Sequence, residues 1–299
     1  MEKLARSTVI GICALLLFIS QPAANGTEKS LRVAAIQLAA SDAGNFTKMR
    51  TMAQNAKAQG AALVIYPESS AFGWLNPESF AKATPIPGAL EAQFSAIARD
   101  VGVWVATSIA ELGPPIGTDG KYHQPYDTGI LIDPTGKLVL RHRKYNVLQN
   151  AFTKDECPPE SGDDGCEYAT GDLADLAIAD TPFGRTAILV CADAYTYDTT
   201  TLSALKKLTP EFVIIPWGIT AGSREECGTP GFNATGYAAD AAKFLGDVVV
   251  VGANATGERP YGRYLPSWYC GTSGYATSAG VGAVADGEQE LFVFDVPVE

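Results

Sequence analysis

Three side chains with complementary chemistry each stand directly after a strand-like run. Glu68 follows a run that ends at residue 67, Lys144 one that ends at residue 143, and Cys191 one that ends at residue 190. In layered α/β folds, reactive groups gather just beyond the carboxyl ends of the strands. The sequence therefore predicts that a carboxylate, an ammonium and a thiol converge on one pocket.

These three groups suit the cleavage of an amide bond. A thiol near its free pKa is a weak nucleophile and needs a base or a positive neighbour. Glu68 can take the Cys191 proton as the sulfur attacks a carbonyl carbon, and the same carboxyl can then protonate the departing amine. Lys144 and the backbone N–H of Ala192 can stabilise the oxyanion that forms.

Each of these residues also has a plainer interpretation. Cys191 can be a small apolar residue of the core, Glu68 a solvated loop residue and Lys144 part of a basic strand edge. A Cys–His peptidase that uses His142 or His123 as its base is a different enzymatic alternative. A secreted, non-catalytic binding module that keeps the fold is a third.

The segments around these residues alternate between strand and helix patterns. Short apolar runs predict buried strands, and Pro-Thr-Gly between two of them predicts a hairpin. Strands covered by helices on their faces predict a layered α/β domain, and no linker or repeat divides the chain. The predicted strands are 31–38, 62–66, 103–107, 129–133, 137–141, 186–191, 212–215, 248–252 and 291–296, and the predicted helices lie within 45–60, 90–98, 202–208 and 237–246.

The composition excludes several classes of protein. Of the 299 residues, 46% are hydrophobic, which is enough for a sizeable core and excludes a disordered chain. The formal net charge of −11 argues against nucleic acid or an anionic membrane surface as a partner, since both need a basic face. With two histidines in the whole chain, a His-built metal site is not expected.

The first residues predict a secretory signal peptide over residues 1–26. Lys3 and Arg6 precede an apolar run at residues 9–19, and small residues follow it. This run is too short to span a bilayer comfortably. We therefore expect residues 27–299 to form one secreted or extracytoplasmic domain, periplasmic in a Gram-negative bacterium.

Removal of the signal leaves five of the six cysteines. An oxidising compartment pairs cysteines, and an odd number leaves one unpaired. Cys157 and Cys166 flank a loop with no core of its own, and Cys227 and Cys270 lie in Gly- and Pro-rich surroundings. We therefore predict the disulfides Cys157–Cys166 and Cys227–Cys270, which leave Cys191 as a free thiol.

Three segments resemble the Glu-Lys-Cys signature of the nitrilase, or carbon–nitrogen hydrolase, superfamily. They are Ile65-Tyr-Pro-Glu68, Arg143-Lys144 after its strand, and Val190-Cys-Ala-Asp193, in the superfamily's order and spacing. The resemblance runs from Leu31 onward. Within the superfamily, residues 143–148, 181–184 and 191–198 are most similar to the secreted vanin and biotinidase branch.

The resemblance implies a fold and a reaction. The fold is an α-β-β-α four-layer sandwich over residues 27–299. The reaction is hydrolysis of a small linear amide, with Glu68 as general base and acid, Lys144 as oxyanion stabiliser and Cys191 as the nucleophile that forms a thioester. Nitrile hydrolysis by the same triad stays open. No metal or other cofactor, no nucleic acid and no membrane partner is expected, and a homodimer stays open.

The chain departs from the superfamily pattern after Lys144. Many members carry a second Glu a few residues after this Lys, where it orients the ammonium group. Residues 145–152 contain no Glu, and Asn150 stands near the expected place. The candidates to replace it are Asn150 and the nearby Glu156, Glu160 and Glu167.

Three aromatic residues are candidates for the walls of the substrate pocket. Tyr195 lies just after the nucleophile, Trp217 follows a predicted strand, and Trp74 follows Glu68. Their alternative role is ordinary packing in the core or at its edge. An aromatic pocket would suit a small linear amide better than a polypeptide.

Overall fold

The computed structural model describes residues 29–116, 122–148, 157, 167–262 and 265–298. The predicted signal at residues 1–26 therefore lies outside the described residues. The helices are α1 (Phe46–Ala58), α2 (Pro77–Ala81), α3 (Ala89–Val101), α4 (Thr200–Lys206) and α5 (Ala234–Leu245), with the short 3-10 turns η3 (Leu173–Asp175) and η4 (Cys191–Ala194).

Two mixed sheets of similar topology form the centre of the molecule. In each, three parallel strands are flanked by antiparallel ones. In order across the first sheet lie β17 (Leu291–Pro297), β1 (Ser30–Ile36), β2 (Leu63–Ile65), β3 (Trp104–Glu111), β6 (Tyr126–Ile132) and β7 (Leu138–Arg143). In order across the second lie β16 (Gly280–Val284), β15 (Gly274–Thr277), β12 (Val249–Asn254), β10 (Phe212–Trp217), β9 (Gly184–Ile188) and β8 (Ala179–Thr181).

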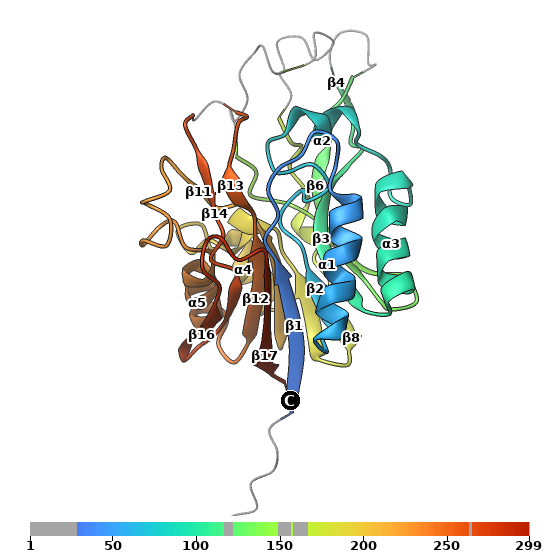
Figure 1. The fold of residues 1–299 in the computed structure, drawn as a ribbon. Helices are drawn as coiled ribbons and strands as arrows, with labels where there is room; N and C mark the ends of the chain where they lie inside the picture. Colours follow the sequence, from blue (N-terminus) through green and yellow to red (C-terminus); the bar gives the residue numbers. More distant parts are fainter. Residues whose placement is uncertain (1–28, 117–121, 149–156, 158–166, 263–264, 299) are drawn as a thin grey trace, which may run out of the picture.

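Smaller sheets extend the loops beyond the sandwich. A three-stranded sheet consists of β11 (Thr220–Ala221), β14 (Trp268–Cys270) and β13 (Thr256–Glu258), and a two-stranded one of β4 (Pro115–Ile116) and β5 (Tyr122–His123). The three-stranded sheet and α2 lie at the end of the molecule opposite the C-terminus (Figure 1). None of the segments in this three-stranded sheet was among the predicted strands, because two- and three-residue strands lack a readable alternation.

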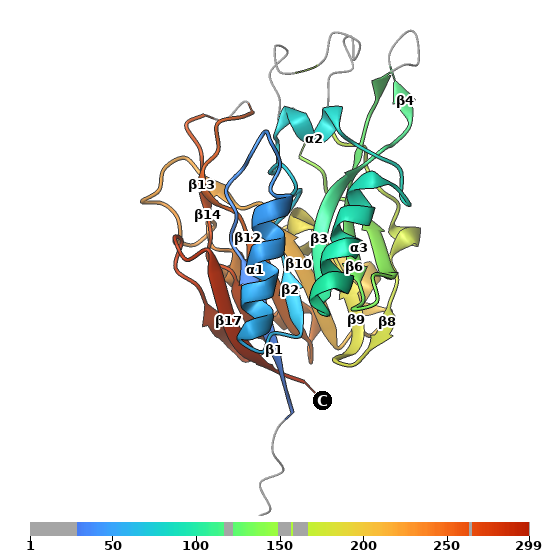
Figure 2. The same ribbon diagram turned by 45° about the vertical axis from the view of Figure 1, so that its right-hand side comes forward.

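The sandwich follows from the alternation of buried side chains along each strand. In β1, Ala34 and Ile36 pack against α1 and α3, whereas Val33 and Ala35 face the second sheet. On the far side, α4 and α5 cover the second sheet in the same way. Helices, two sheets and helices thus form four layers, as Figures 1 and 2 show, and the predicted α-β-β-α sandwich is confirmed.

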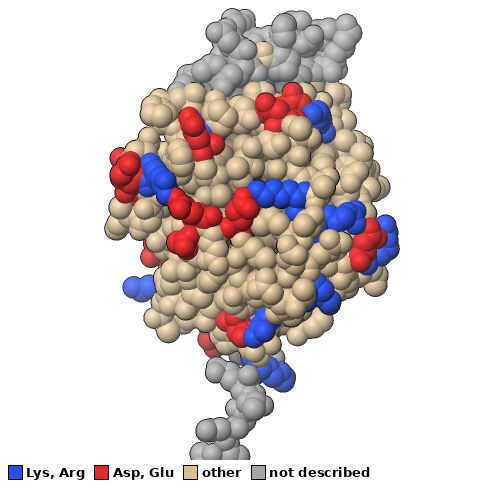
Figure 3. Space-filling model, in the orientation of Figure 1, with Lys and Arg blue, Asp and Glu red and all other residues tan. Residues whose placement is uncertain are grey.

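Helix α1 shows how the sequence directs this packing. Its buried residues Met49, Met52, Ala53 and Ala56 recur at helical spacing and form one apolar face. The predicted hairpin is also present, since β6 and β7 pair in antiparallel register. On the face shown in Figure 3, acidic and basic side chains are interspersed, and ion pairs such as Lys48–Glu290 and Arg224–Glu288 join them. This face therefore carries no broad basic surface of the kind that nucleic acid binds.

Candidate active site

The ends of three strands bring the predicted residues Glu68, Lys144 and Cys191 together. Glu68 follows β2 and Lys144 follows β7, both in the first sheet, whereas Cys191 begins η4 just after β9 of the second. The backbone N–H of Glu68 donates to the carbonyl of Trp217 in the second sheet (3.1 Å). The site therefore spans the seam between the two sheets.

The three side chains are almost completely buried. Glu68 is 0%, Lys144 2% and Cys191 3% exposed. The ammonium of Lys144 donates a hydrogen bond to Oε1 of Glu68. The plainer interpretations of Glu68 as a solvated loop residue and of Lys144 as part of a basic edge are therefore wrong, because both charges lie inside the protein and pair with each other.

Burial and charge set the protonation states of this group. Burial alone would lower the pKa of Lys144, but Glu68, Cys191 and Asp127 together raise it above its ordinary value. Burial first, and the Glu68 carboxylate second, raise the pKa of the Cys191 thiol, against opposing effects of Lys144 and the backbone N–H of Gly218. At neutral pH Lys144 is thus a cation and Cys191 a neutral thiol, which needs a base before it can attack.

The backbone aims the Cys191 side chain at the cavity described below. Its φ of 44° is in the left-handed region that side-chain-bearing residues rarely adopt. This turn ends the strand run and starts η4, with Sγ 3.7 Å from the hydroxyl of Tyr195. Cys191 is the free cysteine among the described residues, in agreement with the prediction.

Asp193 connects the nucleophile turn to the segment that carries Lys144. Its Oδ1 accepts the backbone N–H groups of Tyr145 (3.0 Å) and Asn146 (2.8 Å). Its Oδ2 accepts from Nε2 of His142 (2.9 Å). The sequence analysis did not assign Asp193 a role, although its position two residues after Cys191 was a usable signal.

These contacts also answer the Cys–His alternative. The Nε2 of His142 is bound to Asp193, and Nδ1 of His123 lies 2.8 Å from the carbonyl oxygen of Gly113. The polar groups that face Cys191 in the described part of the chain are Glu68, Lys144, Tyr195 and the Gly218 amide, and no histidine is among them. The carboxylate is therefore the group in position to act as the base.

A cavity of about 460 Å³ opens above Cys191 and Lys144. Its described lining is largely aromatic and apolar, with Trp74, Tyr195, Tyr197, Phe232, Val147, Leu148 and Ile219, and its polar members besides the reactive pair include Asn146, Thr220 and Asp198. Ala192 and Gly218 also line it. Trp74 and Tyr195 thus occupy the wall positions that the sequence predicted.

Trp217 does not line the cavity in the described structure, which corrects its predicted place in the wall. It is 1% exposed and lies behind Tyr195, with the two rings stacked at a centroid distance of 6.4 Å. Tyr237 stacks on Tyr195 at 4.3 Å. The strand places Trp217 inside the core, where it supports the wall residue Tyr195.

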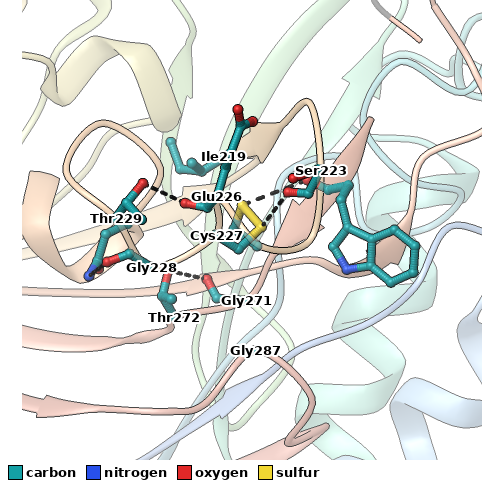
Figure 4. The surroundings of a disulfide bond; sticks show 12 residues. Ile219, Ser223, Glu226, Cys227, Gly228, Thr229, Gly271, Thr272 and Gly287 are labelled. Carbon is teal, nitrogen blue, oxygen red and sulfur yellow. Dashed lines mark hydrogen bonds between the residues drawn. A yellow bond between two sulfur atoms is a disulfide. The ribbon is translucent and has the colours of Figure 1, made fainter. Parts of the chain in front are cut away.

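A disulfide fixes the loop that closes one side of the cavity. Cys227 and Cys270 are bonded, with a Cα–Cα distance of 4.9 Å, and this confirms the predicted pair. Figure 4 shows the bond beside Ser223, Gly228 and Gly271, where the loop after β11 meets the end of β14. The same loop supplies Phe232 to the cavity, so the disulfide holds a cavity wall in place.

The second predicted disulfide is only partly within view. Cys157 is disulfide-bonded, and its predicted partner Cys166 lies outside the described residues. Asn150, Glu156 and Glu160 lie outside them as well. Glu167 is described, and it is not among the groups that act on Lys144.

Gly218 is a position that the geometry reserves for glycine. A Cβ built there would lie 2.2 Å from Oε2 of Glu68 and 3.2 Å from a ring atom of Trp74. We expect Gly218→Ala to displace the Glu68 carboxyl and lower kcat about 100-fold, as a shift of about 1 Å in a reactive group does. Steady-state kinetics on an amide substrate measures this. Gly236→Ala is the matched control, because a Cβ there meets only ordinary contacts. An unchanged kcat in Gly218→Ala would refute the close approach.

Comparisons with known proteins agree with this fold and site. Residues 32–290 match the carbon-nitrogen hydrolase family. An amidase of Nesterenkonia AN1 from the nitrilase superfamily has a similar structure, with a TM-score of 0.67, 21% identity, and coverage of 89% of this chain and 90% of that one. The fold and the paired carboxylate, ammonium and thiol define a hydrolase of the nitrilase type. The chain belongs to the carbon–nitrogen hydrolase family.

Two curated relatives refine the placement. Pantetheinase of Canis lupus familiaris is 24% identical over 185 residues, which cover 52% of this chain and 32% of the relative. Formamidase of Bacillus thuringiensis is 29% identical over 140 residues, which cover 45% of this chain and 35% of the relative. The matched segment thus spans roughly a third of the length of these relatives. The match to a pantetheinase confirms the predicted resemblance to the vanin-like branch.

Proposed function

We propose that this protein hydrolyses the carbon–nitrogen bond of a small linear amide through a cysteinyl thioester. The observation that carries the proposal is the convergence of Glu68, Lys144 and Cys191, from both sheets, at the floor of one cavity. A buried carboxylate beside a neutral thiol is an arrangement for proton transfer, and a buried ammonium beside both is an arrangement for stabilising negative charge.

The first half-reaction forms the thioester. The Oε2 atom of Glu68 accepts no hydrogen bond from the described residues, whereas Oε1 is occupied by Lys144. Oε2 is therefore the free acceptor for the Cys191 proton as Sγ bonds to the carbonyl carbon. When the tetrahedral intermediate collapses, the carbon–nitrogen bond breaks and Glu68 returns the proton to the amine or ammonia that leaves.

The second half-reaction consumes one water molecule. Glu68 takes a proton from the water, the resulting hydroxide bonds to the thioester carbon, and the carbon–sulfur bond breaks. The proton then returns to the thiolate of Cys191, so that acid and free enzyme result. Lys144 stays protonated throughout because its pKa lies above its ordinary value. Its ammonium and the backbone N–H of Ala192, both at the cavity floor, stabilise the oxyanion in each tetrahedral intermediate.

The cavity favours a small acyl group with an apolar or aromatic portion. A volume of about 460 Å³ lies in the range of small-molecule sites. The relatives act in the same direction: their names specify pantetheine and formamide derivatives, and a structure of the Nesterenkonia amidase contains the acetamide moiety of fluoroacetamide bound covalently to the active-site cysteine. These likenesses support an amide substrate and a covalent intermediate.

The test is turnover of a panel of linear amides, with formyl, acetyl, butyryl and aromatic acyl groups, a pantetheine-like amide and one nitrile. Ammonia or amine release is measured, and intact mass after an acid quench detects an acyl adduct. We expect release from at least one amide and an adduct of the matching acyl mass. Turnover of the nitrile alone would replace the amidase assignment, and no release or adduct on the whole panel would contradict a catalytic role.

We also propose that the protein acts outside the cytoplasm. Two observations support this location: the predicted signal at residues 1–26, and the Cys227–Cys270 disulfide, since disulfides persist in oxidising compartments. Among the described residues, no helix is both long and apolar enough to cross a bilayer. Cell fractionation with thiol labelling tests the proposal, and a cytosolic protein with Cys227 and Cys270 reduced would contradict it.

A further inference from the structure

Asp127 is a buried carboxyl beside the proposed triad to which the mechanism above gives no role. It lies near the start of β6, opposite Ala110 of β3, and is 0% exposed. Its backbone carbonyl accepts the N–H of Lys144 (2.8 Å). Its side chain points between the two sheets, where it faces Glu68, Lys144 and the hydroxyl of Ser108.

Two carboxyl groups face each other here with too few hydrogen-bond donors. Both oxygens of Asp127 and Oε2 of Glu68 are buried and accept no direct hydrogen bond from the described residues. The nearby ammonium of Lys144 donates to Glu68 Oε1. Two ionised carboxylates at this distance repel each other, and only one of their charges is balanced by Lys144.

One proton on the pair removes both difficulties. It leaves one ammonium and one carboxylate, so that the buried group is neutral overall, and it converts an acceptor into a donor between the two carboxyls. We propose that Asp127 is a neutral carboxylic acid that donates its proton in a hydrogen bond to Glu68 and thereby keeps Glu68 ionised and oriented toward Cys191. Asp127 is thus a positioning residue, which acts through Glu68.

The charges around the pair assign the proton to Asp127. Burial, and next the Glu68 carboxylate, raise the pKa of Asp127 well above its ordinary value, and Lys144 only partly opposes them. The other titratable group that faces Asp127 is the phenol of Tyr168, which burial and Asp127 keep neutral by raising its pKa. Lys144 bonds directly to Glu68, so Glu68 is the member of the pair that carries the charge.

The activity arm of the test compares Asp127→Asn with Asp127→Ala, and it rests on the proposed amidase function. An asparagine amide is neutral and can donate to Glu68, so we expect Asp127→Asn to recover most of the activity that Asp127→Ala loses. The loss in Asp127→Ala should be about 100-fold in kcat, with little change in KM, because Glu68 loses its orientation. If Asp127 were instead an ionised partner of Lys144, Asn and Ala would be equally poor.

The stability arm needs no turnover. A carboxyl whose folded pKa is raised takes up a proton on folding, so its contribution to stability falls as pH rises above the unfolded pKa of about 3.9. Asp127→Asn removes this uptake. In urea unfolding at constant redox state, the ratio of unfolding constants, wild type over Asp127→Asn, should therefore grow about tenfold per pH unit from pH 5 upward until the folded pKa is reached. Asp180→Asn, at an exposed position of β8, is the matched control with a flat ratio.

The two arms separate failure of this inference from failure of the proposed function. A flat ratio for Asp127→Asn would show an ionised Asp127 and overturn the inference even in an active enzyme. A rising ratio in a protein that turns over no amide would contradict the proposed function and support the shared proton. Equal loss of activity in the Asn and Ala variants would overturn the orienting role.

Discussion

Cys191→Ala is expected to abolish both amide turnover and the acyl adduct. Alanine removes the sulfur that bonds to the carbonyl carbon and leaves Glu68 and Lys144 in place. Loss of a catalytic nucleophile in a hydrolase costs on the order of 10⁶-fold in kcat. Because Cys191 packs in the core cluster of α4, α5 and the second sheet, replacing a thiol by a methyl group should leave the fold intact.

The measurement pairs ammonia release with intact mass, on wild type and Cys191→Ala at equal concentration. Cys191→Ser is a matched variant that keeps the shape of the side chain. Its hydroxyl is a harder group to deprotonate than a thiol, so we expect an adduct to form far more slowly than in wild type. Circular dichroism and thermal unfolding establish that both variants fold. Residual wild-type turnover in Cys191→Ala would remove the thiol from the mechanism and return Cys191 to the role of a core residue.

The sequence analysis located these reactive residues because strand ends are readable. Glu68, Lys144 and Cys191 each follow a run that can only be a strand, and the carboxyl ends of parallel strands meet at one edge of a sheet. The same reasoning could not find the partners that act across the seam. Asp127 stands near the start of a strand, and its approach to Glu68 depends on the register of β6 with β3, which the sequence does not display.

The search for a second carboxyl group shows the limit most clearly. The sequence analysis looked after Lys144, at Asn150 and the loop glutamates, because proximity along the chain was the available guide. The structure places a second carboxyl 17 residues before Lys144, at Asp127, because the β6–β7 hairpin folds the chain back on itself. Trp217 illustrates the same limit: strand position was predictable, but which face of the strand meets the cavity was not.

Glu68→Gln is the second substitution with a large expected effect. Glutamine keeps the length and the Oε1 acceptor for Lys144, but its amide cannot take the proton of the Cys191 thiol. General acid–base catalysis contributes about 10²- to 10⁴-fold. Since Glu68 serves both half-reactions, we expect a loss in kcat/KM near 10⁴-fold for an ordinary amide. The fold should survive, because Asp127 faces Lys144 and can ionise to balance its charge once Glu68 is gone.

An activated ester distinguishes the two uses of the carboxyl. Its leaving group departs without a proton, so acylation of Cys191 in Glu68→Gln should recover in part, whereas hydrolysis of the thioester still lacks a base. The acyl adduct should therefore accumulate in Glu68→Gln and not in wild type, as intact mass would show. Glu78→Gln, a surface substitution on α2, should behave as wild type. Rapid release of acid by Glu68→Gln would assign the base to another group. Asp127 would be the first candidate, because it is the remaining carboxyl that faces both Glu68 and Lys144 in the described structure.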